Sequence, residues 1–121
     1  MNKCLIVDDS RTIRRAILAT MENLSFEFQE AEDGLLALEN CKKSMPSVII
    51  LDWNMPKMSG IEFLRNLRKM PGGEKPKVIL CTTETGLSHI QEALDWGADE
   101  YIMKPFTTDI IKEKLKLLQI I

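Results

Sequence analysis

The chain alternates short, almost wholly apolar runs with longer stretches in which apolar residues recur every three or four positions. The short runs are typical of buried strands, and the longer spacing is typical of amphipathic helices. The pattern predicts strands at 4–7, 26–31, 48–51, 78–81 and 100–103, and helical stretches at 13–24, 35–41, 61–68, 90–94 and 111–118.

Continuously apolar strands belong to parallel sheets that helices cover on both faces. When strands and helices alternate along a chain, right-handed crossovers join the neighbouring strands. We therefore expect an α/β protein with a doubly wound, five-stranded parallel sheet and five helices. In such a sheet the ligand site lies outside the carboxyl ends of the strands, so the residues directly after each strand are the candidates for function.

Several helix starts carry polar residues suited to capping the first turn. Asp33 precedes the second helical stretch, and the spacing of Ser59 and Glu62 is that of a capping box before the third. Thr107 and Thr108 are both able to cap the last helix. The sequence leaves that choice open.

Length and composition indicate one compact domain, which we expect to span residues 1–121. The net charge of −2 lacks the basic footprint of a nucleic-acid-binding protein. No apolar run approaches the roughly 20 residues that cross a bilayer, so we expect no membrane partner. The first residues turn acidic at Asp8 and Asp9 and do not resemble a signal peptide, which predicts a cytoplasmic location.

The three cysteines stand far apart, at Cys4, Cys41 and Cys81, and form no C-x-x-C pair. Neither a zinc site nor a redox dithiol is therefore indicated. Cys4 and Cys81 lie inside apolar runs, and we interpret them as small core residues.

Charged and hydroxyl residues follow four of the five predicted strands: Asp8 and Asp9 the first, Asp52 the third, Thr82 the fourth and Lys104 the fifth. Three carboxylates at one edge of a sheet repel one another unless a cation lies among them, and Mg²⁺ prefers such oxygen ligands. The cation, Lys104 and Thr82 together would neutralise and hydrogen-bond a phosphoryl group. A carboxylate is able to act as the nucleophile and form an aspartyl phosphate.

Three runs of the sequence together resemble the response-regulator receiver family: LIVDDS at 5–10, IILDWNMP at 49–56 and YIMKPF at 101–106. The resemblance covers essentially the whole chain and is closest to the stand-alone chemotaxis type of receiver. It implies the flavodoxin-like strand order 2-1-3-4-5, which the residue pattern does not supply.

The resemblance also implies roles for the acidic residues. Asp52 resembles the phosphoacceptor of the family, and Asp8 and Asp9 resemble the acidic pair that positions Mg²⁺. Asp52 and the backbone carbonyl of Asn54 complete the expected metal ligands. Mg²⁺ is accordingly the expected cofactor.

Other residues match the family's switch. Thr82 resembles the hydroxyl that bonds the phosphoryl group, and Lys104 the lysine that pairs with it. Tyr101 matches the aromatic residue whose rotation reports the active state. The bond between Lys104 and Pro105 matches a cis peptide bond of the family, which an X-Pro bond adopts at low cost.

Some assignments stay open or concern rate. Thr82 and Thr83 should point to opposite faces of the strand, and the spacing to Lys104 favours Thr82. Asn54 and Glu84 occupy the family positions that flank the attacking water, so they are expected to modulate dephosphorylation.

Three neighbours of these motifs have plainer interpretations. Trp53 is either partly exposed beside Asp52 or simply packed. His89 is expected on the surface of a helix. A group of lysines in the last helix is expected to form a solvated face or to favour the helix C-terminus, namely Lys112, Lys114 and Lys116.

The expected function is that of a switch, not an enzyme, beyond catalysis of its own phosphorylation and dephosphorylation. Its partners would be a sensor histidine kinase and a downstream protein, either the flagellar motor switch or a histidine phosphotransfer protein. Because the sequence ends at Ile121, soon after the last helix, we expect a monomer that signals by protein contact without an output domain.

Two other classes of protein share parts of this pattern. The haloacid-dehalogenase-type phosphatases have a D-x-D motif after the first strand, whereas here Asp8 and Asp9 are adjacent and Trp53-Asn54 follow Asp52. Flavodoxin needs a phosphate-binding loop after the first strand, where two carboxylates would repel the phosphate. Both alternatives are disfavoured.

Overall fold

The computed structural model describes residues 2–83 and 87–121. Five parallel strands form one sheet in the order β2-β1-β3-β4-β5. Their bounds are β1 Asn2–Val7, β2 Phe26–Ala31, β3 Val48–Asp52, β4 Lys77–Thr82 and β5 Glu100–Met103. The predicted doubly wound sheet and its flavodoxin-like order are confirmed.

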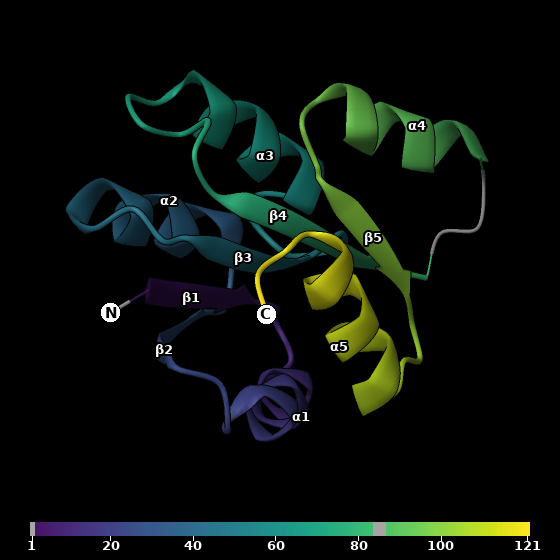
Figure 1. Cartoon of the computed structure of the whole chain (residues 1–121). Coiled ribbons are helices and arrows are strands. Elements are labelled where there is room, and N and C mark those ends of the chain that lie inside the picture. Colours follow the sequence, from purple (N-terminus) through teal and green to yellow (C-terminus); the bar gives the residue numbers. More distant parts are fainter. Residues whose placement is uncertain (1, 84–86) are drawn as a thin grey trace.

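Five helices connect the strands and cover both faces of the sheet. Their bounds are α1 Arg11–Met21, α2 Gly34–Lys43, α3 Gly60–Lys69, α4 Leu87–Asp95 and α5 Thr108–Leu117. Helices α1 and α5 lie on one face, and α2, α3 and α4 lie on the other (Figure 1). None of these helices has the length and apolar character that a bilayer crossing requires.

Each strand contributes side chains to two separate cores, which explains why the strand runs are continuously apolar. Leu5 and Val7 of β1 belong to the core under α2, α3 and α4, whereas Cys4 and Ile6 belong to the core under α1 and α5. Burial raises the pKa of Cys4 and of Cys81 to about 12. Both thiols are therefore protonated, unreactive core groups, as the sequence indicated.

Four helices begin with a side-chain cap. The hydroxyls of Ser10, Ser59 and Thr107 and the carboxylate of Asp33 each accept a hydrogen bond from the backbone N–H three residues on. Such caps satisfy one of the amide groups that a helix start leaves unpaired. Thr107 resolves the choice that the sequence left open for the last helix.

Gly60 allows α3 to begin directly against the end of β3. Its amide donates to the carbonyl oxygen of Trp53 at 2.8 Å. A Cβ atom at Gly60 would lie 2.3 Å from the carbonyl oxygen of Asp52, which is closer than any real contact. Any residue with a side chain would clash there, so glycine is required for the close approach of the start of α3 to the end of β3.

Candidate functional site

The polar residues that follow the strands meet at one edge of the sheet, as predicted. Asp8 follows β1, Asp52 ends β3, Thr82 ends β4 and Lys104 follows β5. The strands lie side by side in the order β1-β3-β4-β5, so residues far apart in sequence become neighbours. We call this edge of the sheet the carboxyl-end rim.

Lys104 connects two of the carboxylates directly. Its Nζ donates to Oδ1 of Asp52 at 2.8 Å and to Oδ2 of Asp8 at 3.0 Å. The backbone N–H of Lys104 donates to the carbonyl oxygen of Thr82 at 2.9 Å, which holds the start of this loop against β4. The peptide bond between Lys104 and Pro105 is cis, as the resemblance implied.

The carboxylates of Asp8, Asp9 and Asp52 form a compact oxygen cluster. One oxygen from each residue lies within 4.8 Å of the others. Asp8 is 2% exposed and Asp52 is 6% exposed, whereas Asp9 is exposed. An all-oxygen donor set of three carboxylates fits a hard divalent cation such as Mg²⁺ and does not fit a thiolate-preferring metal.

The charges at the rim are unbalanced, with three carboxylates around one ammonium group. Burial raises the pKa of Asp52 above its ordinary value of 3.8, and the neighbouring Asp8 adds to this, although the hydrogen bond from Lys104 opposes it. Burial disfavours the charged form of Lys104, but its hydrogen bonds to Asp52 and Asp8 outweigh this and raise its pKa. The site therefore keeps its lysine charged and has excess negative charge.

Asp8 is held from four sides. Its N–H donates to the carbonyl of Ala31 at 3.1 Å, and its Oδ1 accepts from the N–H of Ser10 at 2.9 Å. Its own carbonyl oxygen accepts from Nη1 of Arg14 at 2.6 Å. Lys104 supplies the fourth contact. The contact of Arg14 could not be predicted from the sequence, because an arginine in an amphipathic helix gives no sign of which backbone group it reaches.

Thr82 and Thr83 differ in burial. Thr82 is buried at the end of β4, next to the register pair of Asp52 and Cys81, whereas Thr83 is exposed. Thr83 lines a shallow apolar hollow together with residues of α1 and of the loop after Lys104. The difference supports the preference for Thr82 that spacing gave, and the role of its hydroxyl stays a prediction.

Tyr101 lies half-buried on β5 and packs against the core under α2, α3 and α4. Nζ of Lys114 lies 5.5 Å from the centre of its ring and 3.3 Å from a carboxylate oxygen of Glu100. Lys114 lies in the last turn of α5, which is one of the two placements expected from the sequence, but its contact with Tyr101 was not predicted. Its charge covers the phenol ring, an arrangement that stabilises one position of Tyr101.

Two aromatic side chains are in contact near the end of β3. Trp53 is buried, and its ring lies edge to face with that of His89, with centroids 5.7 Å apart. The packed interpretation of Trp53 is therefore the correct one, and the exposed His89 of α4 lies against it. Asn54 is exposed just beyond, and Glu84 lies outside the described residues.

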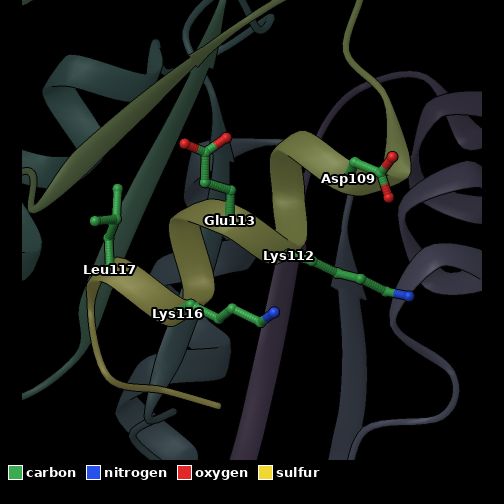
Figure 2. A pocket seen from close by; sticks show the side chains of 5 residues that line it. All are labelled: Asp109, Lys112, Glu113, Lys116 and Leu117. Atoms are coloured by element: carbon green, nitrogen blue, oxygen red, sulfur yellow. The ribbon is translucent and has the colours of Figure 1, made fainter.

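A second hollow lies along α5 (Figure 2). Its charges alternate in sign, and none of its residues belongs to the predicted site. The residues that line it are Asp109, Lys112, Glu113, Lys116 and Leu117. This face agrees with the solvated character expected for Lys112 and Lys116.

The sequence and the fold are similar to those of known proteins. The family described as the response regulator receiver domain matches residues 4–116. Chemotaxis protein CheY1 of Helicobacter pylori is 40% identical over 118 residues, which are 96% of this chain and 95% of that protein. Chemotaxis protein CheY-3 of Vibrio cholerae is 43% identical over 114 residues, covering 93% of this chain and 88% of that one. The solved structure of chemotaxis response regulator CheY4 of Vibrio cholerae is similar with a TM-score of 0.90 at 35% identity, covering 98% of each chain.

Proposed function

The chain belongs to the response regulator receiver domain family, and on that premise we propose that it is a phosphorylation switch whose acceptor is Asp52. One observation carries the proposal. The buried carboxylate of Asp52 bonds to Lys104 at 2.8 Å, and two further carboxylates lie within 4.8 Å of it. A carboxylate nucleophile, a charge-pairing lysine and a cation-binding pair are the groups that phosphoryl transfer to aspartate requires.

Each residue of the rim has a definite part in the proposed transfer. A carboxylate oxygen of Asp52 attacks the phosphorus atom, and the bond between phosphorus and the donor nitrogen of a histidine kinase breaks. Lys104 pairs with the transferred group, and the hydroxyl of Thr82 donates a hydrogen bond to it. Asp8, Asp9, Asp52 and the carbonyl of Asn54 would hold Mg²⁺, which when bound supplies neutralising charge beside the phosphoryl oxygens.

The proposed output passes through Tyr101. Movement of Thr82 toward the phosphoryl group changes the space beside Tyr101 and shifts the population of its rotamers. The surface of α4, β5 and α5 then changes, and a partner protein reads it. The names of the relatives support chemotaxis as the pathway. In this proposal a histidine kinase acts upstream and the flagellar motor switch downstream. In this proposal the protein is a cytoplasmic, single-domain monomer.

Phosphorylation of Asp52 is tested by incubating the protein with acetyl phosphate and Mg²⁺ and measuring the intact mass. We expect addition of one phosphoryl group to the wild type and none to Asp52→Asn. Asp109→Asn, which changes an exposed carboxylate on α5, should be labelled like the wild type. Equal labelling of Asp52→Asn would disprove the acceptor assignment.

The lifetime of the phosphoryl group tests the residues that flank it. Replacing exposed Asn54, or Glu84, should change the rate of dephosphorylation while phosphorylation still occurs. The rate is followed by loss of the added mass after removal of acetyl phosphate. If neither substitution changes the rate, other residues govern access of water.

The output surface distinguishes a chemotaxis switch from a relay. Beryllofluoride with Mg²⁺ stands in for the phosphoryl group, and we expect it to shift NMR signals of Tyr101 and Ile90 as well as those near Asp52. Tyr101→Ala should be phosphorylated normally but bind a downstream partner less well. Shifts confined to the rim would favour the alternative, an intermediate that passes its phosphoryl group to a histidine phosphotransfer protein.

A further inference from the structure

Arg14 joins the turn that carries two of the candidate metal ligands to a neighbouring strand. Its Nη1 donates to the carbonyl oxygen of Asp8 at 2.6 Å, and its Nε donates to Oε1 of Glu30 at 3.0 Å. Glu30 belongs to the edge strand β2, in register with Ile6. The guanidinium group therefore links α1, the end of β1 and the end of β2.

The contact of Arg14 is largely covered by its surroundings. The side chain of Arg14 is 12% exposed and that of Glu30 is 28% exposed, so the charge of Arg14 and its two hydrogen bonds are partly shielded from water. The adjacent Arg15 is 60% exposed, lies 4.0 Å from the second oxygen of Glu30 and has a different position on the helix. The two contacts use different nitrogens of the planar guanidinium, Nε for Glu30 and Nη1 for Asp8, so their relative geometry is fixed. A lysine, with one flexible ammonium group, lacks this fixed geometry.

We propose that Arg14, held by Glu30, is a positioning residue that fixes the Asp8–Asp9 turn so that both carboxylates face a divalent cation. The inference rests on the proposed function, because it concerns the same metal site. The carbonyl group of Asp8 belongs to the peptide unit that joins Asp8 to Asp9. The hydrogen bond that Arg14 donates to its oxygen therefore fixes the plane of that peptide. The orientation of the exposed Asp9 follows from that plane.

The sign of the expected effect separates positioning from electrostatics. Arg14 carries a positive charge beside a cation site, so removing that charge should by itself strengthen Mg²⁺ binding. Loss of positioning should weaken it, as happens when partners that orient metal ligands are removed. The two explanations therefore predict opposite changes in the dissociation constant.

The test compares Arg14→Gln with Arg15→Gln, which removes the same charge one residue away without touching Asp8. Mg²⁺ dissociation constants are measured by isothermal titration calorimetry, at a temperature where circular dichroism shows each variant folded. We expect the dissociation constant to rise about tenfold in Arg14→Gln. Arg15→Gln should bind Mg²⁺ as tightly as the wild type or slightly more tightly.

Arg14→Lys provides the decisive second variant and also serves if Arg14→Gln fails to fold. It keeps the charge but loses the planar guanidinium that fixes the geometry of the two contacts, so positioning predicts weakened binding and a role of charge predicts wild-type binding. Unchanged or tighter Mg²⁺ binding in both Arg14 variants would overturn the inference while the proposed function stands. Failure of the wild type itself to bind Mg²⁺ or accept a phosphoryl group would instead refute the proposed function.

Discussion

The two ends of the sheet hold their buried charges in opposite ways. At the amino end, Arg68 of α3 donates to the carbonyls of Gly73 and Pro76 at 2.8 and 2.9 Å, to the carbonyl of Gly97 and to the carboxylate of Asp99. Oδ2 of Asp99 also accepts from the N–H of Val78. This cation has acceptors on every side and connects the segments that enter β4 and β5.

At the carboxyl-end rim the balance is reversed. The ammonium group of Lys104 contacts the carboxylates of Asp8 and Asp52, and the carboxylate of Asp9 lies close to these two. Burial, together with the neighbouring charge of Asp8, raises the pKa of Asp52 and disfavours its ionised form. The paired charges at the amino end therefore stabilise the fold. The unbalanced carboxylates of the rim destabilise it but provide a site where a cation binds.

Arg68→Ala should cause the largest loss of stability. It removes the arginine donor from several carbonyls and one charged partner from Asp99, and removing one partner of a largely buried ion pair costs about 3 kcal/mol. The side chain of Arg68 is 17% exposed, so solvent screens it little. The free energy of unfolding is measured by urea titration.

Arg65→Ala is the matched control for Arg68→Ala. Arg65 lies one turn earlier on α3, pairs with Glu92 at 3.8 Å and has its guanidinium 4.8 Å from the centre of the Trp96 ring. Both contacts are partly exposed, so their loss should cost less than about 2 kcal/mol. Mg²⁺ binding should stay unchanged in both variants. Equal losses of stability would show that the network around Arg68 contributes no more than a surface ion pair.

Asp9→Asn should weaken Mg²⁺ binding about tenfold, which corresponds to about 1.4 kcal/mol. Because Asp9 is exposed, its metal-free stability should change by less than about 0.5 kcal/mol. Fluorescence of the buried Trp53 is the readout, in a Trp96→Phe background that removes the second tryptophan. An unchanged dissociation constant would exclude Asp9 as a ligand.

Asp52→Asn should give the smallest effect, a gain in stability of the metal-free protein at neutral pH. A carboxyl whose pKa is raised on folding stabilises the protein while it is protonated. That stability is lost as the pH rises from the ordinary value of 3.8 through the raised value. The asparagine cannot ionise, so the difference between variant and wild type should grow with pH over this window.

Urea titrations of both proteins at several pH values without Mg²⁺ measure this difference. Saturating Mg²⁺ should reverse the order of stability, because the wild type keeps all three carboxylates. A variant that is less stable than the wild type at neutral pH without Mg²⁺ would contradict the idea of excess negative charge at the rim.

The residue pattern was sufficient to predict the fold class, the positions of the strands and the residues that form the rim. Periodicity located all five strands, and the parallel arrangement then brought Asp8, Asp52 and Lys104 together without any knowledge of contacts. These features depend on local patterns that every residue of an element shares. The strand order came from family resemblance, because five strands of similar character allow several orders.

Contacts of single side chains across elements could not be predicted. Arg14 and Arg68 appeared only as polar positions on helices, although both reach backbone carbonyls of other segments. Lys114 was expected on a solvated face or near the helix C-terminus, and it lies in the last turn of α5, but its contact with Tyr101 was not predicted. Such contacts depend on how each helix is rotated and placed on the sheet, and periodicity fixes that placement only to within about one residue.

The order of the strands along the chain also has a consequence for folding during synthesis. A ribosome completes β1, β2 and β3, with all three acids of the rim, before it adds the 52 residues that lead to Lys104. At about 5 to 20 residues per second, the acids precede their lysine by roughly 3 to 10 seconds. Lys104, which follows β5, therefore approaches a rim whose carboxylates have already been synthesised and carry the opposite charge. Electrostatic attraction thus favours docking of β5, the last strand to leave the ribosome.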